Sequence, residues 1–211
     1  YKKKIKNIKV CIKKEITERN YDYKISLGSL NKYFYKSKNS KSSDLINFDN
    51  IKKSQWNSIL RNNKKNIGLV WSGYFFGPKQ PSRSIELKNF QKILGLDVNF
   101  YSFQSEIWSR DKEFFYNSNI IDLSKKSISE ILAIIKNLDL VISTDTFFLH
   151  LSCICSKETW GLIGLDADWR WYEYYKHNPY ETLKIYKQHD YKSWDSVIQN
   201  VYDDLKIKFN F

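Results

Sequence analysis

The 211-residue sequence has few cysteines and no long apolar run. Its three cysteines, Cys11, Cys153 and Cys155, form an odd set without the paired spacing of a disulfide framework or a structural zinc site. We therefore predict that they are small apolar residues of the core. No apolar stretch approaches the roughly 18 residues of a transmembrane helix, and the charged start lacks the apolar stretch of a signal peptide. These absences lead us to expect a cytoplasmic protein.

Familiar catalytic and nucleic-acid-binding motifs are also missing. The sequence contains no nucleophile elbow, P-loop or GxGxxG fingerprint, and no RNP motif, zinc finger or helix-turn-helix signature. Asp166 and Asp168 are too close in the sequence to be read as a glycosidase pair. The sequence also shows no 34-residue period, the signature of tetratricopeptide repeats. Function must therefore be inferred from the order of strands, turns and helices.

The net charge of +12 is concentrated in the first third of the chain. Residues 1–65 contain 18 Lys or Arg against 5 Asp or Glu, giving +13, whereas residues 66–211 contain 17 against 18, giving −1. A lysine-rich run is more often a solvated face than a recognition site, although it could touch nucleic acid or anionic lipid. We predict no specific nucleic-acid partner.

The pattern of apolar residues changes near residues 62–66. Before this point, only Ile8–Ile12 and Asp22–Leu30 are extended in character, too little for an independent sheet. After it, strands are predicted at Ile67–Trp71, Val98–Phe103, Ile120–Ile121, Leu140–Ser143, Thr159–Ile163 and Leu183–Tyr186. Helices are predicted at Leu87–Leu94, Arg110–Tyr116, Ile128–Asn137, Phe147–Cys155 and Trp194–Lys206, the last capped by Ser193. Such alternation predicts an α/β fold over residues 66–211, a parallel sheet with helices on both faces, preceded by the incomplete lysine-rich segment 1–65.

The strongest functional feature is the polar turn that follows the apolar strand Leu140–Ser143. Ser143, Asp145 and Thr146 suit the first turn of a helix, where free N–H groups and hydroxyls can bind phosphate. Asp145 would repel an anion, so we expect it to face a neutral hydroxyl, as on a sugar. The turn therefore predicts a ligand in which a sugar is attached to a phosphate.

Two further loops follow predicted strands and carry polar groups. In the first, Gly73 and Gly77 permit close backbone approach, and Arg83 could bind phosphate through two parallel hydrogen bonds. In the second, the Gln104 amide could read a base edge. Each has an alternative reading as a solvated or structural residue. Because ligands of parallel sheets bind at the carboxyl ends of the strands, we expect the three loops to converge on one site.

Single histidines and aromatics in this region allow two readings. His150 shares its predicted helix with Phe147, Leu151 and Ile154, so a core histidine is as plausible as a ligand contact. The cluster Trp169–Tyr172 could stack a nucleoside or a sugar ring, although aromatic-rich turns more often serve packing.

Five segments together carry a family resemblance: Ile67–Gly73, Arg83–Ile85 before Phe90, Tyr101–Gln104, Asp139–Thr146 with His150 and Leu151, and Asp168–Trp171. In order and spacing they resemble the C-terminal half of bacterial heptosyltransferase-like glycosyltransferases, most closely those usually fused to tetratricopeptide repeats. The upstream segment Tyr21–Leu30 is similar to the region where the N-terminal domain of that family ends.

The resemblance implies a GT-B architecture of two Rossmann-like domains, in which the C-terminal domain, here residues 66–211, holds the nucleotide-sugar donor. It also implies sugar transfer without a cofactor or an obligatory metal ion. Arg83 would stabilise the leaving diphosphate, while the catalytic base is unknown. The implied donor-binding residues are Ser72, Gly73, Gln104, Ser143, Thr144, Asp145, Thr146 and His150.

Two departures from the family pattern bear on function. Related sequences often have Lys soon after the glutamine, where this one continues from Gln104 with Ser105 and Glu106. The N-terminal domain, which binds the acceptor and is expected to supply the base, is almost wholly absent, as are the tetratricopeptide repeats. We predict a glycosyltransferase, or a fragment of one, acting on a carbohydrate or protein acceptor. The alternatives are a non-catalytic nucleotide-sugar-binding module that needs a partner chain or domain, and a Rossmann-like domain for another phosphorylated ligand.

Overall fold

The computed structural model describes residues 60, 64–73, 83–168, 171, 180–191 and 193–211. All of them belong to one compact unit, Lys41–Phe211. The extended stretches predicted at Ile8–Ile12 and Asp22–Leu30, and nearly all of segment 1–65, lie outside the described residues.

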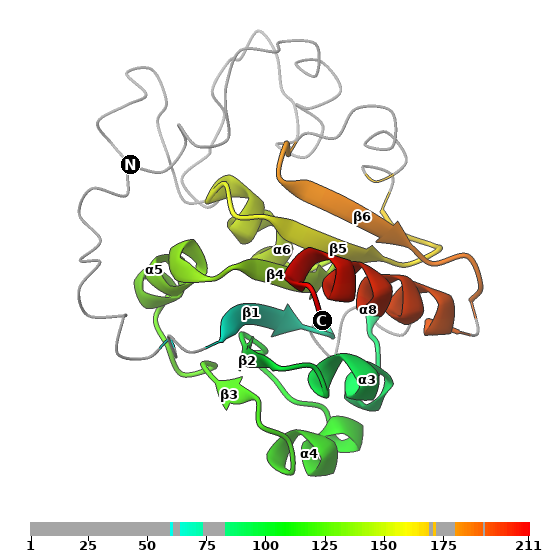
Figure 1. Cartoon of the computed structure of the whole chain (residues 1–211), viewed down its shortest axis with the longest axis horizontal. Helices are drawn as coiled ribbons and strands as arrows, with labels where there is room; N and C mark the ends of the chain where they lie inside the picture. Colours follow the sequence, from blue (N-terminus) through cyan, green and yellow to red (C-terminus); the bar gives the residue numbers. More distant parts are fainter. Residues whose placement is uncertain (1–59, 61–63, 74–82, 169–170, 172–179, 192) are drawn as a thin grey trace, which may run out of the picture. The chain divides into compact units, whose positions relative to one another are not determined.

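The described residues form a six-stranded parallel sheet in the order β3-β2-β1-β4-β5-β6 (Figure 1). The strands are β1 (Lys65–Val70), β2 (Val98–Ser102), β3 (Ile121–Asp122), β4 (Leu140–Thr144), β5 (Thr159–Ile163) and β6 (Leu183–Lys187). The predicted α/β fold with a parallel sheet is confirmed. From β1 the chain adds β2 and β3 on one side of the sheet, and it then returns to add β4, β5 and β6 on the other side. The strand order therefore reverses between β1 and β4.

Helices follow the strands: η5 (Leu87–Phe90), α3 (Gln91–Leu94), α4 (Ser109–Tyr116), α5 (Ile128–Asn137), α6 (Phe147–Ile154) and α8 (Asp195–Phe209). The segment predicted as one helix, 87–94, begins with a 3-10 turn. Ser193 was predicted to cap the last helix, but the N-cap position is Trp194, which makes no side-chain capping hydrogen bond. The Ser193 Oγ, one residue earlier, accepts from the Asp195 N–H at 2.9 Å. A capping box begins α5, where the Ser127 side chain accepts from the Glu130 N–H and Glu130 accepts from the Ser127 N–H.

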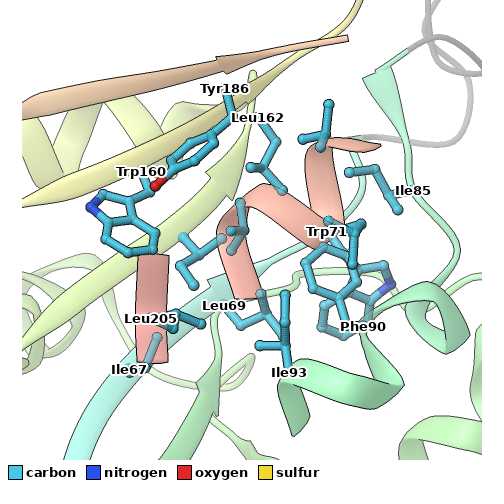
Figure 2. Packing of buried hydrophobic residues seen from close by; sticks show 14 of the residues in the cluster. Ile67, Leu69, Trp71, Ile85, Phe90, Ile93, Trp160, Leu162, Tyr186 and Leu205 are labelled. Carbon is cyan, nitrogen blue, oxygen red and sulfur yellow. The ribbon is translucent and has the colours of Figure 1, made fainter. Parts of the chain in front are cut away.

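Alternate residues of each strand supply the two faces of the core. Ile67, Leu69 and Leu140 belong to the cluster that packs against α3 and α8, which is drawn in Figure 2 with Leu205 of α8. Val70 and Val141 belong to the cluster on the opposite face, together with apolar residues of α5 and α6. Both faces are therefore covered, which explains the continuous apolar runs of β1 and β4.

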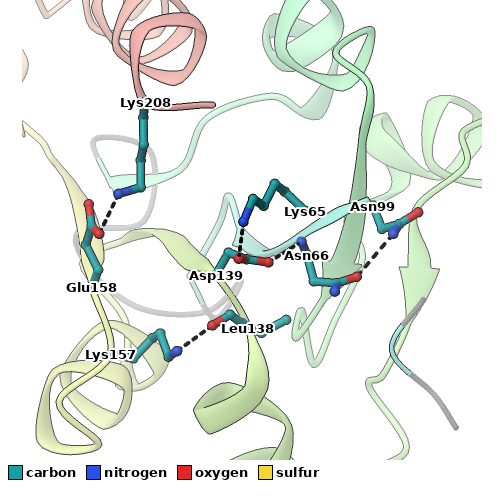
Figure 3. Close-up of polar contacts among 8 residues, drawn as sticks. All are labelled: Lys65, Asn66, Asn99, Leu138, Asp139, Lys157, Glu158 and Lys208. Carbon is teal, nitrogen blue, oxygen red and sulfur yellow. Dashed lines mark hydrogen bonds and ion pairs between the residues drawn. The ribbon is translucent and has the colours of Figure 1, made fainter. Parts of the chain in front are cut away.

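Polar contacts tie the strands together at their amino ends (Figure 3). Asp139, just before β4, accepts from the Asn66 N–H at 2.8 Å and from Lys65 Nζ at 3.1 Å. The Asn66 side chain accepts from Asn99 Nδ2 at 3.1 Å, and Lys157 Nζ donates to the Leu138 carbonyl. These groups satisfy one another, so this edge of the sheet is a structural one.

The described cysteines lie in the core, as predicted. Cys153 and Cys155 are free thiols within or beside α6. Burial raises the pKa of Cys153 to about 12 and that of Cys155 to about 11, so both stay protonated at neutral pH. Cys11 lies outside the described residues.

Candidate functional site

A cavity of about 340 Å³ opens at the carboxyl ends of β1, β2 and β4. This is the place where the strand order reverses, the usual ligand site of open α/β sheets. Its lining residues are Val70, Ser72, Gly73, Arg83, Gln104, Ser105, Asp145, Thr146, Phe147, Phe148 and His150. The structure thus brings together residues from the three loops that the sequence singled out.

The loop after β1 is held in place by Gln104. The Gln104 side chain is buried, its Oε1 accepts from the Ser72 N–H at 3.2 Å, and its Nε2 donates to the Ser72 carbonyl at 2.9 Å. The Gly73 N–H donates to Ser84 Oγ at 3.3 Å. Both the oxygen and the nitrogen of the Gln104 amide are bonded to the Ser72 backbone. In this structure Gln104 therefore holds the loop and has no free amide edge for a nucleotide base.

Ser72 brings a hydroxyl with unused hydrogen-bonding capacity to the cavity. The residue is 1% exposed, and its Oγ has no hydrogen-bond partner among the residues that the structure describes. A buried polar group without a partner costs free energy, which a ligand oxygen or N–H would recover. Ser72 is therefore a candidate ligand contact.

Two side chains that can carry positive charge, Arg83 and His150, lie close to Asp145. Its carboxylate is 2% exposed, with Oδ2 lying 3.7 Å from Arg83 Nη1 and Oδ1 lying 3.7 Å from His150 Nε2. Both separations exceed normal hydrogen-bond length. The Arg83 Nε is buried without a hydrogen-bond partner in the described part of the chain. Arg83 therefore keeps donor capacity for a ligand anion while its charge is partly balanced by Asp145.

His150 is fixed by aromatic neighbours. Its Nδ1 lies 3.1 Å from the Tyr180 hydroxyl, and its ring stacks on Trp171 with centroids 5.6 Å apart at 17°. Trp171 is fully buried, so in this structure it packs the histidine. The other members of the predicted stacking cluster, residues 169, 170 and 172, lie outside the described residues.

The first turn of α6 faces the cavity without a side-chain cap. Thr146 occupies the capping position but makes no capping hydrogen bond, and its Oγ1 instead lies 3.0 Å from Ser143 Oγ. Among the described residues, the N–H groups of Phe147 and Phe148 have no acceptor. Ser143 and Thr144 are fully buried in β4 and shape the turn without lining the cavity. Free N–H groups and the helix dipole together favour an anion here.

Two aromatic residues of the cavity were not identified from the sequence. Phe148 stacks on Phe103 with centroids 5.7 Å apart, and Phe147 meets Phe148 edge-on at 5.4 Å. Phe147 is 57% exposed, although it shares its helix with the buried Leu151. The available signal was its position: the first residue of a helix that starts at a sheet edge lies beyond the core.

The described residues contain no group of three or more His, Cys, Asp or Glu side chains placed to hold a metal ion. None of the helices in the described ranges combines the length and apolar character needed to cross a bilayer. Metal independence and cytoplasmic location stay predictions.

No protein-family model matches the chain, and no curated protein matches it. Solved structures do. The Escherichia coli heptosyltransferase WaaC with ADP aligns at a TM-score of 0.52 and 11% identity, covering 74% of this chain and 48% of that one. The E. coli ADP-heptose lps heptosyltransferase II aligns at 0.50 and 12% identity, covering 72% of this chain and 49% of that one.

The chain thus spans about half the length of each matched heptosyltransferase. At these identities the likeness shows the fold alone. It confirms, for the fold, the resemblance to heptosyltransferase-like GT-B proteins; the link to tetratricopeptide repeats stays a prediction.

Proposed function

We propose that the cavity binds a nucleoside-diphosphate sugar and that the chain takes part in sugar transfer from it. One observation carries the proposal: a guanidinium, the uncapped start of a helix and an unpartnered buried hydroxyl line one cavity at the reversal point of a parallel sheet. The matched WaaC structure contains ADP, which supports a nucleoside diphosphate as the ligand class.

The charges of the cavity suit the two ends of such a donor. The diphosphate would lie against Arg83 and the free N–H groups of Phe147 and Phe148, which offer donors to its oxygens. Asp145 repels phosphate, so a neutral hydroxyl-bearing group such as the sugar fits beside it. A sugar hydroxyl would donate to Asp145, a bond that an anion without a proton cannot make.

Arg83 would then act on the leaving group. When the bond between the anomeric carbon and the diphosphate oxygen breaks, negative charge develops on the diphosphate. A guanidinium already in place stabilises that charge, and removing one such preorganised group typically lowers turnover about 100- to 1000-fold. Asp145 and His150 face each other, and we assign neither as the base that activates the acceptor.

A non-catalytic nucleotide-sugar-binding module is the second candidate. The chain covers only about half of each matched heptosyltransferase, so acceptor-side groups can belong to another domain or chain. Binding alone does not separate the two functions. Release of nucleoside diphosphate from a bound sugar nucleotide, in the presence of acceptors, does so.

The first test is a titration of the full chain with ADP, UDP and GDP, followed by tryptophan fluorescence and thermal melting. A ligand at about a hundred times its Kd should raise stability by about 2.7 kcal/mol. Arg83→Ala should weaken binding at least tenfold, and Arg83→Lys should restore part of it. Lys125→Ala, which removes a positive charge from an exposed position before α5, serves as the matched control. No binding of any nucleotide, or equal binding by Arg83→Ala, would contradict the proposal.

A further inference from the structure

The cavity has two chemically different walls. Arg83, Asp145 and His150 form the charged wall, where both ion-pair distances are 3.7 Å. Phe147 and Phe148 form the aromatic wall. The charged wall suits a diphosphate and a sugar, and the proposed function uses the backbone N–H groups of Phe147 and Phe148 but not their rings.

The aromatic wall is built on a rigid base. Phe148 is partly buried and stacks on the fully buried Phe103 at the end of β2, at an interplanar angle of 26°. Phe147 stands against the Phe148 ring at 71°, so an edge-to-face contact orients it. Its own ring is 57% exposed. The structure thus holds an apolar ring in solvent at the rim of a polar cavity, and a flat apolar partner would recover the free energy of its exposure.

Resting on the proposed function, we infer that Phe147 is the stacking surface for the base of the nucleotide. The diphosphate occupies the charged wall and the start of α6, and the base turns to the ring of the first residue of that helix. The amide side chain among the lining residues of the cavity, that of Gln104, is already engaged with Ser72 at both ends. The cavity therefore recognises the base by stacking on its aromatic face more than by hydrogen bonds to the groups at its edge.

Stacking without edge recognition has a measurable consequence for selectivity. Every base has a π-face, so stacking tolerates different bases, and a larger ring system gives the stronger contact. The wild-type chain should bind ADP and GDP more tightly than UDP by a modest factor. Removing the ring should weaken the purine nucleotides most, so that the three affinities become nearly equal.

The test compares wild type, Phe147→Ala and Phe147→Tyr in titrations with ADP, UDP and inorganic pyrophosphate. Phe147→Ala should weaken ADP binding about 5- to 150-fold, the range for loss of one base–aromatic stack, while pyrophosphate binding stays unchanged. Phe147→Tyr keeps the ring and should keep the affinity. Tyr116→Ala, which removes another exposed aromatic ring, 72% exposed on α4, is the matched control and should bind as wild type does.

Each outcome decides the inference. Equal ADP affinity in wild type and Phe147→Ala overturns it, and so does a parallel loss of ADP and pyrophosphate binding, which indicates a general disturbance of the α6 start. If the wild type binds nucleotides and only Arg83→Ala weakens them, the base-stacking role fails while the proposed function stands. If the wild type binds none, both fail together.

Discussion

At the scale of single residues, Asp111 connects two parts of the site that are distant in sequence. Its buried carboxylate accepts from Trp71 Nε1 at 3.0 Å and from the Leu87 N–H at 2.9 Å. The Ile85 N–H donates to the Trp71 carbonyl at 2.9 Å. These bonds hold residues on both sides of Arg83, so Asp111 positions the segment that carries the proposed diphosphate contact.

Removing this carboxylate should cost both stability and binding. Asp111→Ala leaves two buried N–H donors without an acceptor, and we expect the free energy of unfolding to fall by about 3 kcal/mol. Urea denaturation measures this change, and a nucleotide titration under folding conditions should show weaker binding. Asp111→Asn, which keeps one acceptor oxygen, should lose less.

Asp97→Ala provides the control, because the Asp97 side chain is 72% exposed and pairs with Lys64 at the surface. It should change stability by less than about 1 kcal/mol. A similar small change in Asp111→Ala would show that the buried bonds of Asp111 contribute little.

The sequence predicted that polar side chains in the loops after strands meet at one edge of the sheet. Arg83, in the loop after β1, and Asp145, directly after β4, were identified in this way, and the structure places both at one cavity. Asp111 was not, because its partners Trp71 and Leu87 lie 40 and 24 residues away, a separation that no local pattern encodes. The exposure of Phe147 was not predicted either, because helical periodicity gives no information on where the sheet ends.

At the scale of elements, a polar contact anchors the C-terminal helix to the edge of the sheet. Asp204 on α8 accepts from Lys184 Nζ and from the Tyr186 hydroxyl on β6, both at 2.7 Å. These hydrogen bonds, from Lys184 first and Tyr186 second, lower the pKa of Asp204. Burial, followed by the hydrogen bond to Asp204, raises the pKa of Tyr186.

The direction of these shifts sets a pH window for the contact. Because the folded-state pKa of Asp204 is lowered, its contribution is complete above the unfolded value of about 3.9 and is lost as pH falls through the folded pKa. Because the pKa of Tyr186 is raised, its contribution is complete below about 10 and is lost as pH rises. Asp204→Asn should therefore be about 1 kcal/mol less stable than wild type at pH 7, with a difference that shrinks below about pH 4.

Denaturant unfolding at pH 7 and at about pH 3 measures both values. Asp203→Asn is the matched control: it makes the same charge change one residue earlier, where the carboxylate accepts, among the described residues, from Gln199 on its own helix. A loss of stability in Asp204→Asn that stays constant with pH, or that Asp203→Asn reproduces, would show that Asp204 does not anchor α8 to β6.

The central strands were predictable because β4, β5 and nearly all of β1 are buried on both faces and therefore read as apolar runs. The strand predicted at Thr159–Ile163 has those bounds in the structure. The ends of other elements depend on distant contacts: β1 starts at Lys65, an exposed residue that pairs with Asp139. Likewise, the 3-10 start at Leu87 coincides with a hydrogen bond to Asp111. Apolar patterning determines the middle of an element, whereas its ends follow from partners elsewhere in the chain.

At the scale of the whole molecule, the amino ends and the carboxyl ends of the central strands have different roles. The amino ends of β1, β2 and β4 are joined by mutually satisfied polar side chains (Figure 3), whereas their carboxyl ends line the cavity. The sequence predicted the functional edge because the carboxyl ends of parallel strands meet there. It did not predict the strand order, which emerges from packing of the helices on both faces.

Charge is also distributed unequally along the whole chain. Residues 1–65 carry +13, while residues 66–211 carry −1. Salt screens the attraction of a lysine-rich segment to polyanions, since the Debye length is only about 8 Å at physiological salt. Arg83, by contrast, is 23% exposed and lines the cavity. The chain should therefore show two anion affinities that differ in their dependence on salt.

Binding of heparin to the full chain should be much more sensitive to salt concentration than binding of ADP. Retention on heparin should be lost by about 0.3 M NaCl, because each phosphate- or sulfate-type contact of a polyanion releases counterions, whereas ADP affinity should fall by no more than about threefold. Arg83→Ala should lose ADP binding and elute from heparin as wild type does. If ADP and heparin binding instead decline in parallel with salt, and Arg83→Ala weakens neither, nucleotides bind through the diffuse charge of the chain and not through the cavity.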